Sequence, residues 1–259
     1  MSSRSVTDDA DPAAHMVGMK ETIAAIVIVL VLVDFILTAV RICRNPQHRR
    51  EYSDTVRSIR WWMVPAGLAH LVAVGATAVL LFTLVPPLRY GWWSLLGGSG
   101  NVLLGQTGNS GTPWRLVGIV LPLSLVVVVP WLAHLEESTF RAGSEDRSVP
   151  RRLAVQLGFG LIHCVSGVPL AVGIALTISG LYYERVYLTA MSRWRSAITA
   201  IVDIEIQTHG TQVQVVTAAA TVKAEALKHH PITTAAAAHT VSNWLVLSVL
   251  LVSLSGLVT

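Results

Sequence analysis

Long uninterrupted apolar runs constrain this chain more than any other feature of its sequence. The first run, from Ile23 to Ile42, reads IAAIVIVLVLVDFILTAVRI, and a helix of about twenty residues at ~1.5 Å per residue crosses a ~30 Å hydrocarbon core. Further runs extend over 61–85, 116–135, 153–165, 168–183 and 235–258. Inside a bilayer the backbone polar groups must be satisfied within the chain, which favours helices. We therefore expect an all-α, polytopic transmembrane helix bundle of about six to eight helices.

The composition agrees with a membrane protein. Of the 259 residues, 53% are hydrophobic and 13% are charged, and the mean hydropathy is +0.58. A soluble domain carries about twice that charged fraction, and a disordered chain is far less apolar, so both classes are excluded. The net charge of +4 is also typical of nucleic-acid-binding proteins, but in a membrane protein basic residues mark the cytoplasmic loops. We expect a lipid bilayer around the chain and no nucleic-acid partner.

The distribution of lysine and arginine predicts the orientation. Basic residues gather in three stretches, 41–60, 141–152 and 185–228, whereas Arg4, Lys20, Arg89 and Arg115 fall on the other side of the spans. The positive-inside rule then predicts a multi-pass protein of the cell membrane with six spans, an external N-terminus and three cytoplasmic basic loops.

The chain divides into three parts on this topology. Residues 1–21 form an extracytoplasmic tail, and residues 22–115 hold two spans followed by a glycine-rich loop. Residues 116–259 form the remaining core, with an inserted, largely helical cytoplasmic segment at about 186–234. Ser166, Gly167 and Pro169 separate two shorter apolar runs and predict a tight turn between two helices.

A polar side chain at membrane depth is costly unless it faces the protein interior, so each one is a functional candidate. Eight residues meet this description: Asp34, His70, His134, Glu136, Glu137, His163, His239 and Asn243. Asp34 stands alone in the first span, and we expect it to pair with a residue such as His70 or to reach toward the polar end of the span.

The sequence Glu136-Glu137-Ser138-Thr139-Phe140-Arg141 continues the third span. Glu137 and Arg141 are four residues apart with the acid first, which is the favourable order for an ion pair on one helix face. Glu136 projects to another face and remains a free carboxylate. A partly desolvated carboxylate of this kind suits a general base, although charged residues at the end of a span are also common without a catalytic role.

Two further patterns place histidines in spans. In Phe159-Gly160-Leu161-Ile162-His163, the glycines at 158 and 160 allow another helix or a peptide to approach closely. In His239-Thr240-Val241-Ser242-Asn243, the imidazole and the carboxamide are four residues apart and share one helix face. They suit stabilisation of an oxyanion, and they also suit simple bonding between helices.

Together, EExxxR, FxxxH and HxxxN, in this order on three spans, resemble the three motifs of the CAAX protease and bacteriocin-processing family. These intramembrane endopeptidases are similar to the Ras-converting enzyme. The resemblance covers about residues 116–258. One departure is the stretch of about fifty residues at 186–234, where the family has a short connection.

The resemblance implies hydrolysis of a peptide bond in a peptide, lipidated or membrane-protein substrate. Its implied roles are Glu136 as the base, His163 as its partner in binding water, and His239 with Asn243 as donors to the oxyanion. Glu137 and Arg141 are implied as a structural ion pair, and Phe159 as a supporting residue. These residues are expected to line a cavity that faces the cytoplasm.

Cofactor use and function both have alternatives. No HExxH motif is present, and we expect no cofactor; if zinc takes part, Glu136, His163 and His239 supply the two histidines and one carboxylate of a catalytic site. The alternative function is a catalytically silent membrane protein of the same fold that acts as an immunity factor or scaffold. A small proton-linked transporter is a third hypothesis, which the absence of an internal repeat disfavours.

Overall fold

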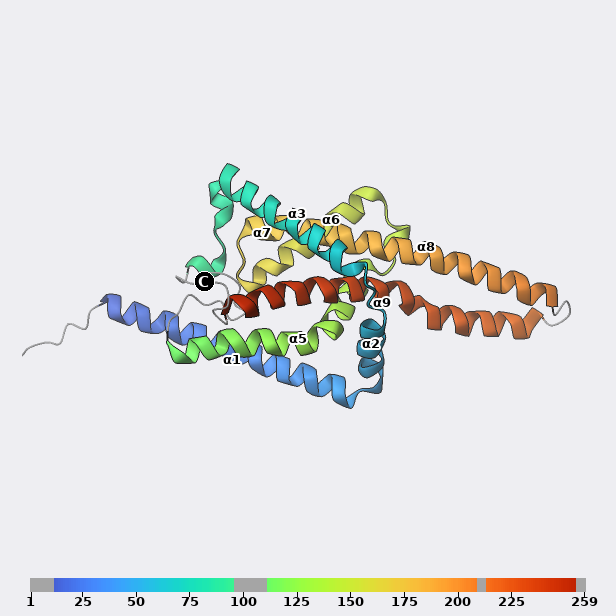
Figure 1. Cartoon of the computed structure of the whole chain (residues 1–259), viewed down its shortest axis with the longest axis horizontal. Helices are drawn as coiled ribbons and strands as arrows, with labels where there is room; N and C mark the ends of the chain where they lie inside the picture. Colours follow the sequence, from blue (N-terminus) through green and yellow to red (C-terminus); the bar gives the residue numbers. More distant parts are fainter. Residues whose placement is uncertain (1–11, 96–110, 209–212, 255–259) are drawn as a thin grey trace, which may run out of the picture.

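The computed structural model of the chain describes residues 12–95, 111–208 and 213–254. Within these residues every regular element is a helix, which confirms the predicted all-α bundle (Figure 1). The tail residues 1–11 and residues 96–110, which make up most of the predicted glycine-rich loop, lie outside the described part.

The helices follow one another with short connections. In chain order they are α1 (Pro12–Arg44), α2 (Pro46–Arg57), α3 (Met63–Leu84), η1 (Pro86–Arg89), α4 (Trp92–Leu95), α5 (Thr112–Arg141), η3 (Ser144–Asp146), α6 (Val149–Ile162), η4 (His163–Ser166), α7 (Leu170–Ala175), α8 (Thr177–Thr208) and α9 (Val213–Leu254). Proline stands in the first turn of α2, α5 and α6, where its missing N–H has no helical partner to lose.

Four helical segments in the described part are long and apolar enough to cross a membrane: Thr22–Arg44, Met63–Leu84, Thr112–Asp146 and Pro231–Ser253. They match the first, second, third and last predicted spans, and they indicate a membrane protein. Two other spans were expected at 153–165 and 168–183. There the structure has α6 of 14 residues, α7 of six residues and the beginning of α8 at Thr177. Helices α6 and α7 are each shorter than the ~20 residues that a single helix needs to cross a bilayer.

The predicted tight turn between α6 and α7 is confirmed. Gly167 has φ +93°, a left-handed conformation that glycine adopts at no steric cost. The indole N–H of Trp92 donates to the carbonyls of Cys164 and Val165, at 3.0 and 3.2 Å. The segment that follows α3 is thus tied to the turn between α6 and α7.

A close approach of backbones fixes α6 against α7 and the start of α8, as the glycine at 160 predicted. A Cβ on Gly160 would meet the carbonyl oxygen of Gly173 and would lie 2.7 Å from the amide nitrogen of Thr177. A Cβ on Gly158 has no neighbour within 4 Å. Of the glycines at 158 and 160, only Gly160 is required for this contact, because its missing side chain leaves room for the neighbouring backbone.

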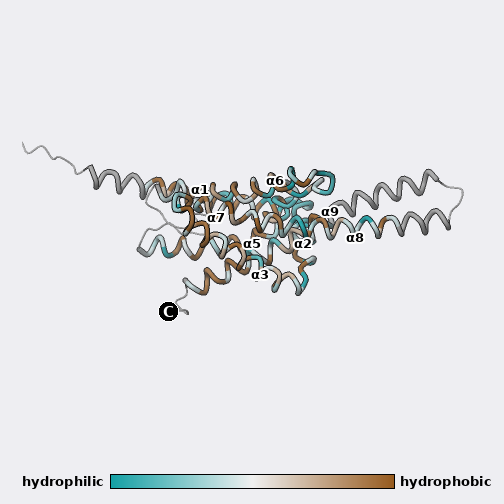
Figure 2. The backbone as a smooth tube through the Cα atoms, turned by 90° about the horizontal axis from the view of Figure 1, so that it is seen from above, coloured by the Kyte–Doolittle hydropathy of each residue, from teal (hydrophilic) through white to brown (hydrophobic). Residues whose placement is uncertain are grey.

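The segment at about 186–234, expected to be a largely helical insert, is formed by the end of α8 and the beginning of α9. Helix α8 continues to Thr208 and α9 begins at Val213, and the two helices, which pack on each other, extend from one end of the bundle (Figure 1). The alanine-rich composition of 213–227 explains this, because alanine has the highest helix propensity. Figure 2 also shows hydrophilic residues gathered around α2 and the start of α6, at the same end.

The four long apolar helices differ in the fraction of each helix that is buried inside the protein. About half of the apolar window of α5 and of α9 is buried (50% each), against 22% for α1 and for α3. We therefore call α5 and α9 the inner spans and α1 and α3 the outer spans. The inner spans pack on each other, and α8 packs on α9.

Candidate functional site

The last turns of α5 place two charged side chains fully inside the protein. Glu137 and Arg141 are both 0% exposed, and Arg141 Nε lies 3.2 Å from Glu137 Oε2. The ion pair predicted from their spacing of four residues is confirmed. Removing two charges from water is costly, so such a pair needs further partners to be tolerated.

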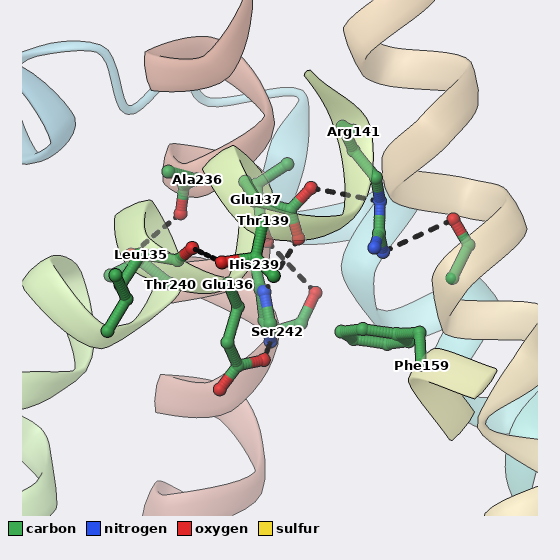
Figure 3. Close-up of polar contacts among 12 residues, drawn as sticks. Leu135, Glu136, Glu137, Thr139, Arg141, Phe159, Ala236, His239, Thr240 and Ser242 are labelled. Carbon is green, nitrogen blue, oxygen red and sulfur yellow. Dashed lines mark hydrogen bonds and ion pairs between the residues drawn. The ribbon is translucent and has the colours of Figure 1, made fainter. Parts of the chain in front are cut away.

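Arg141 finds these partners on α6 and α8. Its guanidinium carbon lies 4.3 Å from the centroid of the Phe159 ring, and its Nη2 donates to the carbonyl of Gly180 at 3.4 Å. Figure 3 shows the guanidinium directly above the Phe159 ring. The ring face attracts the cation and excludes water from it.

His239 on α9 lies between the two glutamates (Figure 3). Its Nδ1 is 2.9 Å from Glu137 Oε1, and its Nε2 is 3.8 Å from Glu136 Oε2. Glu137 is therefore more than the partner of Arg141: one carboxylate oxygen faces the guanidinium and the other bonds the imidazole. The sequence predicted the contact of Glu137 with Arg141 and did not show its contact with His239.

Glu136 differs from its neighbour in exposure. Its side chain is 38% exposed, whereas that of Glu137 is 0% exposed. Glu136 was expected to face away from Arg141, and the side chain that it approaches is that of His239. The separation of 3.8 Å between Glu136 Oε2 and His239 Nε2 is longer than a hydrogen bond. The two side chains are therefore close but not hydrogen-bonded to each other.

Phe159 connects the two histidines of the predicted site. Its ring, 1% exposed, lies edge to face with the imidazoles of His163 and His239, with centroids 5.0 and 5.8 Å away. His163 Nδ1 is 2.8 Å from the carbonyl oxygen of Phe159. Because a carbonyl only accepts, Nδ1 carries the proton in this contact, an assignment made from the bonding pattern. His163 is half-buried, at the C-terminal end of α6.

Asn243 is the predicted catalytic residue with the fewest contacts to the rest of the predicted site. It lies one turn beyond His239 on α9 and is half-buried. Among the described residues no hydrogen bond or ion pair joins it to Glu136, His163 or His239. Of the four predicted catalytic residues, the structure thus pairs Glu136 with His239, sets His163 against Phe159, and leaves Asn243 at the edge.

Sequence reasoning missed an aromatic contact on the other face of His239. The Tyr183 ring stacks on this imidazole with centroids 4.3 Å apart and planes at 19°. On the far side, His70 of α3 stacks on Tyr182 at 4.5 Å and meets Tyr183 edge-on at 5.6 Å. The adjacent Tyr182-Tyr183 pair on an apolar run was the available signal, but a pair of rings does not reveal which helix faces it.

His70 is buried, and neither ring nitrogen has a hydrogen-bond partner among the described residues. The expected pairing of Asp34 with His70 is therefore wrong. Asp34 is exposed on α1, while the His70 ring faces α8. The two residues do not meet because α1 packs on α2 and α5 whereas α3 packs on α7, α8 and α9, and a sequence does not show which spans are neighbours.

The zinc set suggested by the sequence does not fit this geometry. In the described part of the chain no three histidine, cysteine or acidic side chains are grouped as metal ligands. The bonds of His239 and His163 through Nδ1 leave Nε2 of each ring available, so the misfit lies in the grouping of the side chains and not in occupied nitrogens. We therefore derive no chemical step through a metal.

A second polar network anchors the end of α5 beside the site. In the loop between α5 and α6, Ser144 bonds Glu184 of α8, and the Tyr187 hydroxyl donates to Glu145 at 2.8 Å. Burial, together with the bonded Glu145 carboxylate, raises the pKa of the Tyr187 phenol. These contacts hold the loop against α8 and so fix the turn that carries Glu137 and Arg141.

Comparisons of the chain with protein-family models, with curated proteins and with solved structures find no match. The resemblance to the CAAX protease and bacteriocin-processing family therefore rests on the three motifs and their order.

Proposed function

We propose that the protein is an intramembrane endopeptidase that hydrolyses a peptide bond in a peptide, lipidated or membrane-protein substrate. The observation that carries the proposal is the approach of Glu136 to His239 in a buried polar centre held by Glu137 and Arg141. A partly exposed carboxylate beside an imidazole is the pair that general acid–base hydrolysis needs.

In the proposed reaction, a water molecule binds between the Glu136 carboxylate and the His239 ring. Glu136 accepts a proton from the water as its oxygen attacks the carbonyl carbon of the peptide bond. The carbonyl oxygen becomes an oxyanion in the tetrahedral intermediate. Glu136 then passes the proton to the amide nitrogen as the carbon–nitrogen bond breaks, and the products are a carboxylic acid and an amine.

Glu137 and Arg141 have positioning roles in this mechanism. Glu137 accepts from Nδ1–H of His239 at 2.9 Å, and this bond turns Nε2 toward Glu136. A carboxylate that orients an imidazole in this way fixes its tautomer. Arg141 balances the charge of Glu137, and Phe159 keeps the guanidinium in place.

His163 and Asn243 complete the proposed set. With Nδ1 bonded to the Phe159 carbonyl, His163 has Nε2 left to bind the water or the substrate. The side-chain amide of Asn243 would donate to the oxyanion from the helix face that also carries His239. Substrate-free catalytic groups often stand farther apart than in the reacting complex.

We further propose that the protein is a multi-pass protein of the cell membrane with its N-terminus outside and the polar centre toward the cytoplasm. This orientation is supported by the basic loops 41–60 and 141–152. These loops flank the end of the bundle where hydrophilic residues gather in Figure 2, and the Glu136 turn of α5 leads into the second of them.

The test is cleavage of a panel of fluorogenic peptides and membrane-anchored substrates by the purified protein in liposomes. Wild type is compared with Glu136→Gln, His239→Ala and a control, Glu51→Gln, which removes a carboxylate on α2 outside the polar centre. We expect Glu136→Gln to lower the rate on the order of 10²- to 10⁴-fold and the control to leave it unchanged. Equal cleavage by all four proteins would contradict the proposal.

A second candidate, a catalytically silent membrane scaffold, is favoured by one observation. Asn243 contacts none of the other proposed catalytic residues in the described part of the chain. If the folded wild-type protein cleaves no member of the panel while it captures a membrane protein equally well with and without Glu136→Gln, the scaffold replaces the protease.

A further inference from the structure

A cavity separate from the polar centre, which is formed by Glu136, Glu137, Arg141 and His239, opens beside the start of α3. It has a volume of about 440 Å³ and lies between the connection from α2 to α3, helix α8 and helix α9. The residues important for its chemistry are Arg60, Trp61, Trp62, Arg193, Trp194 and Thr234. The proposed endopeptidase mechanism uses none of these residues.

The charge of this cavity is uncompensated. Arg60 and Arg193 are both exposed, and within the described residues neither guanidinium has an ion pair or a hydrogen bond. None of the described side chains that line the cavity is acidic. The neighbouring Arg195 is different, because Glu145 holds it at 3.5 Å. Two free guanidinium groups in one cavity attract an anion, and phosphate is a group that arginine binds well.

The cavity also contains an unused hydrogen-bond donor. The indole N–H of Trp194 is buried and has no partner among the described residues. A buried polar group without a partner is unusual and calls for a ligand or a water molecule. An oxygen-rich anion held by Arg60 and Arg193 offers such an acceptor.

The position of the cavity indicates where its ligand comes from. Trp61 and Trp62 directly precede α3, which begins at Met63, and Thr234 lies four residues into the span Pro231–Ser253 counted from its first residue. Two spans therefore start at this level. Trp61 is 84% exposed, and exposed tryptophans at span ends are typical of the boundary between headgroups and acyl chains.

We propose that this cavity binds the headgroup of an anionic phospholipid. The phosphate lies between Arg60 and Arg193 and accepts a hydrogen bond from Trp194, while the Trp61 and Trp62 rings pack on the glycerol and the first acyl carbons. The lipid thereby joins the α2–α3 connection to α8 and α9. This proposal is independent of the proposed catalysis.

The test uses full-length protein purified in an uncharged detergent, with binding measured as quenching of tryptophan fluorescence by bromine-labelled phosphatidylglycerol. Bromine-labelled phosphatidylcholine and inorganic phosphate are the comparison ligands. We expect tighter binding of phosphatidylglycerol than of phosphatidylcholine. The double variant Arg60→Gln with Arg193→Gln is expected to weaken binding of phosphatidylglycerol on the order of 10- to 30-fold, given the usual contribution of each basic residue near an anionic surface.

Two matched controls separate the cavity from general effects. Arg44→Gln with Arg151→Gln removes two exposed arginines elsewhere and should leave binding unchanged. Trp194→Phe should weaken binding by a few fold, whereas Trp93→Phe, which removes another buried indole N–H that has no partner among the described residues, should not.

Three results would overturn the proposal. The first is equal affinity for phosphatidylglycerol in the wild type and the Arg60/Arg193 variant. The second is an equal loss of binding in the Arg44/Arg151 control, which would show a non-specific charge effect. The third is competition by inorganic phosphate at the same concentration as the lipid, which would identify a site for a free anion.

Discussion

The inner and outer spans handle polar residues in different ways. On the inner spans α5 and α9, Glu137, Arg141 and His239 are buried and each contacts another of the three. On the outer span α1, Asp34 is exposed. The difference shows that a polar residue in an apolar run indicates a site only when its helix is surrounded by other helices, because only there can it find fixed partners.

His70 is the instructive exception on the outer spans. It is buried on α3, yet its ring is held by stacking on Tyr182 and not by hydrogen bonds to the described residues. The outer span α3 thus contributes the His70 ring to the group of stacked rings that includes Tyr182, Tyr183 and His239. Among the described residues no charged side chain pairs with this ring.

The largest expected effect on stability is the loss of an inner-span partner. Arg141→Ala leaves the buried Glu137 carboxylate without its cation, so we expect unfolding to become easier by about 3–5 kcal/mol. Equilibrium unfolding in mixed detergent micelles measures this. Arg44→Ala, at the exposed end of the outer span α1, should change the value by less than about 0.5 kcal/mol. Equal effects would remove the distinction between the two sets of spans.

A smaller effect on stability is expected from the close backbone contact of α6 with α7 and the start of α8. Gly160→Ala places a Cβ against the Gly173 carbonyl and the Thr177 amide nitrogen, which should cost about 1–3 kcal/mol. Gly158→Ala on the same helix meets nothing within 4 Å and should be neutral or stabilising by up to about 1 kcal/mol. Thermal melts of both variants decide this, and a larger loss at 158 than at 160 would contradict the packing.

The exception on the outer spans can be tested with His70→Phe. This change keeps a ring on Tyr182 and removes two buried nitrogens that lack partners among the described residues, so stability should stay equal or rise by about 1 kcal/mol. His70→Asn, which removes the ring and keeps a polar group, should lower the melting temperature. A clear loss with Phe would show that the nitrogens have a partner that matters.

The smallest expected effect is that of metal removal. Because the described side chains do not form a three-ligand group, dialysis against a chelator should leave peptide cleavage within about two-fold of the untreated protein. Loss of cleavage that added zinc restores would contradict this.

Local geometry explains which features the sequence predicted. The Glu137–Arg141 pair and the turn at Gly167 follow from spacing along one segment, and both are confirmed. The bond from Glu137 to His239 joins residues 102 positions apart, and the sequence carries no sign of which carboxylate faces α9. The same holds for the stacking of Tyr183 on His239.

The segment at about 186–234 was predicted to be largely helical, but its sequence did not show that it continues the two neighbouring helices. The sequence showed a break in hydropathy, but a helix that leaves the apolar region remains a helix when its residues have high helix propensity. The unbroken course of α8 to Thr208 and the start of α9 at Val213 therefore required the structure.

The most direct measurement for the central claim is the ratio of single-turnover cleavage rates of Glu136→Gln and Asp34→Asn in liposomes. Both changes replace a carboxylate by its amide, one on an inner span and one on an outer span. The account predicts a rate at least about 100-fold lower for Glu136→Gln, with Asp34→Asn within about two-fold of wild type and equal melting temperatures for both. Equal rates in the two variants would contradict it.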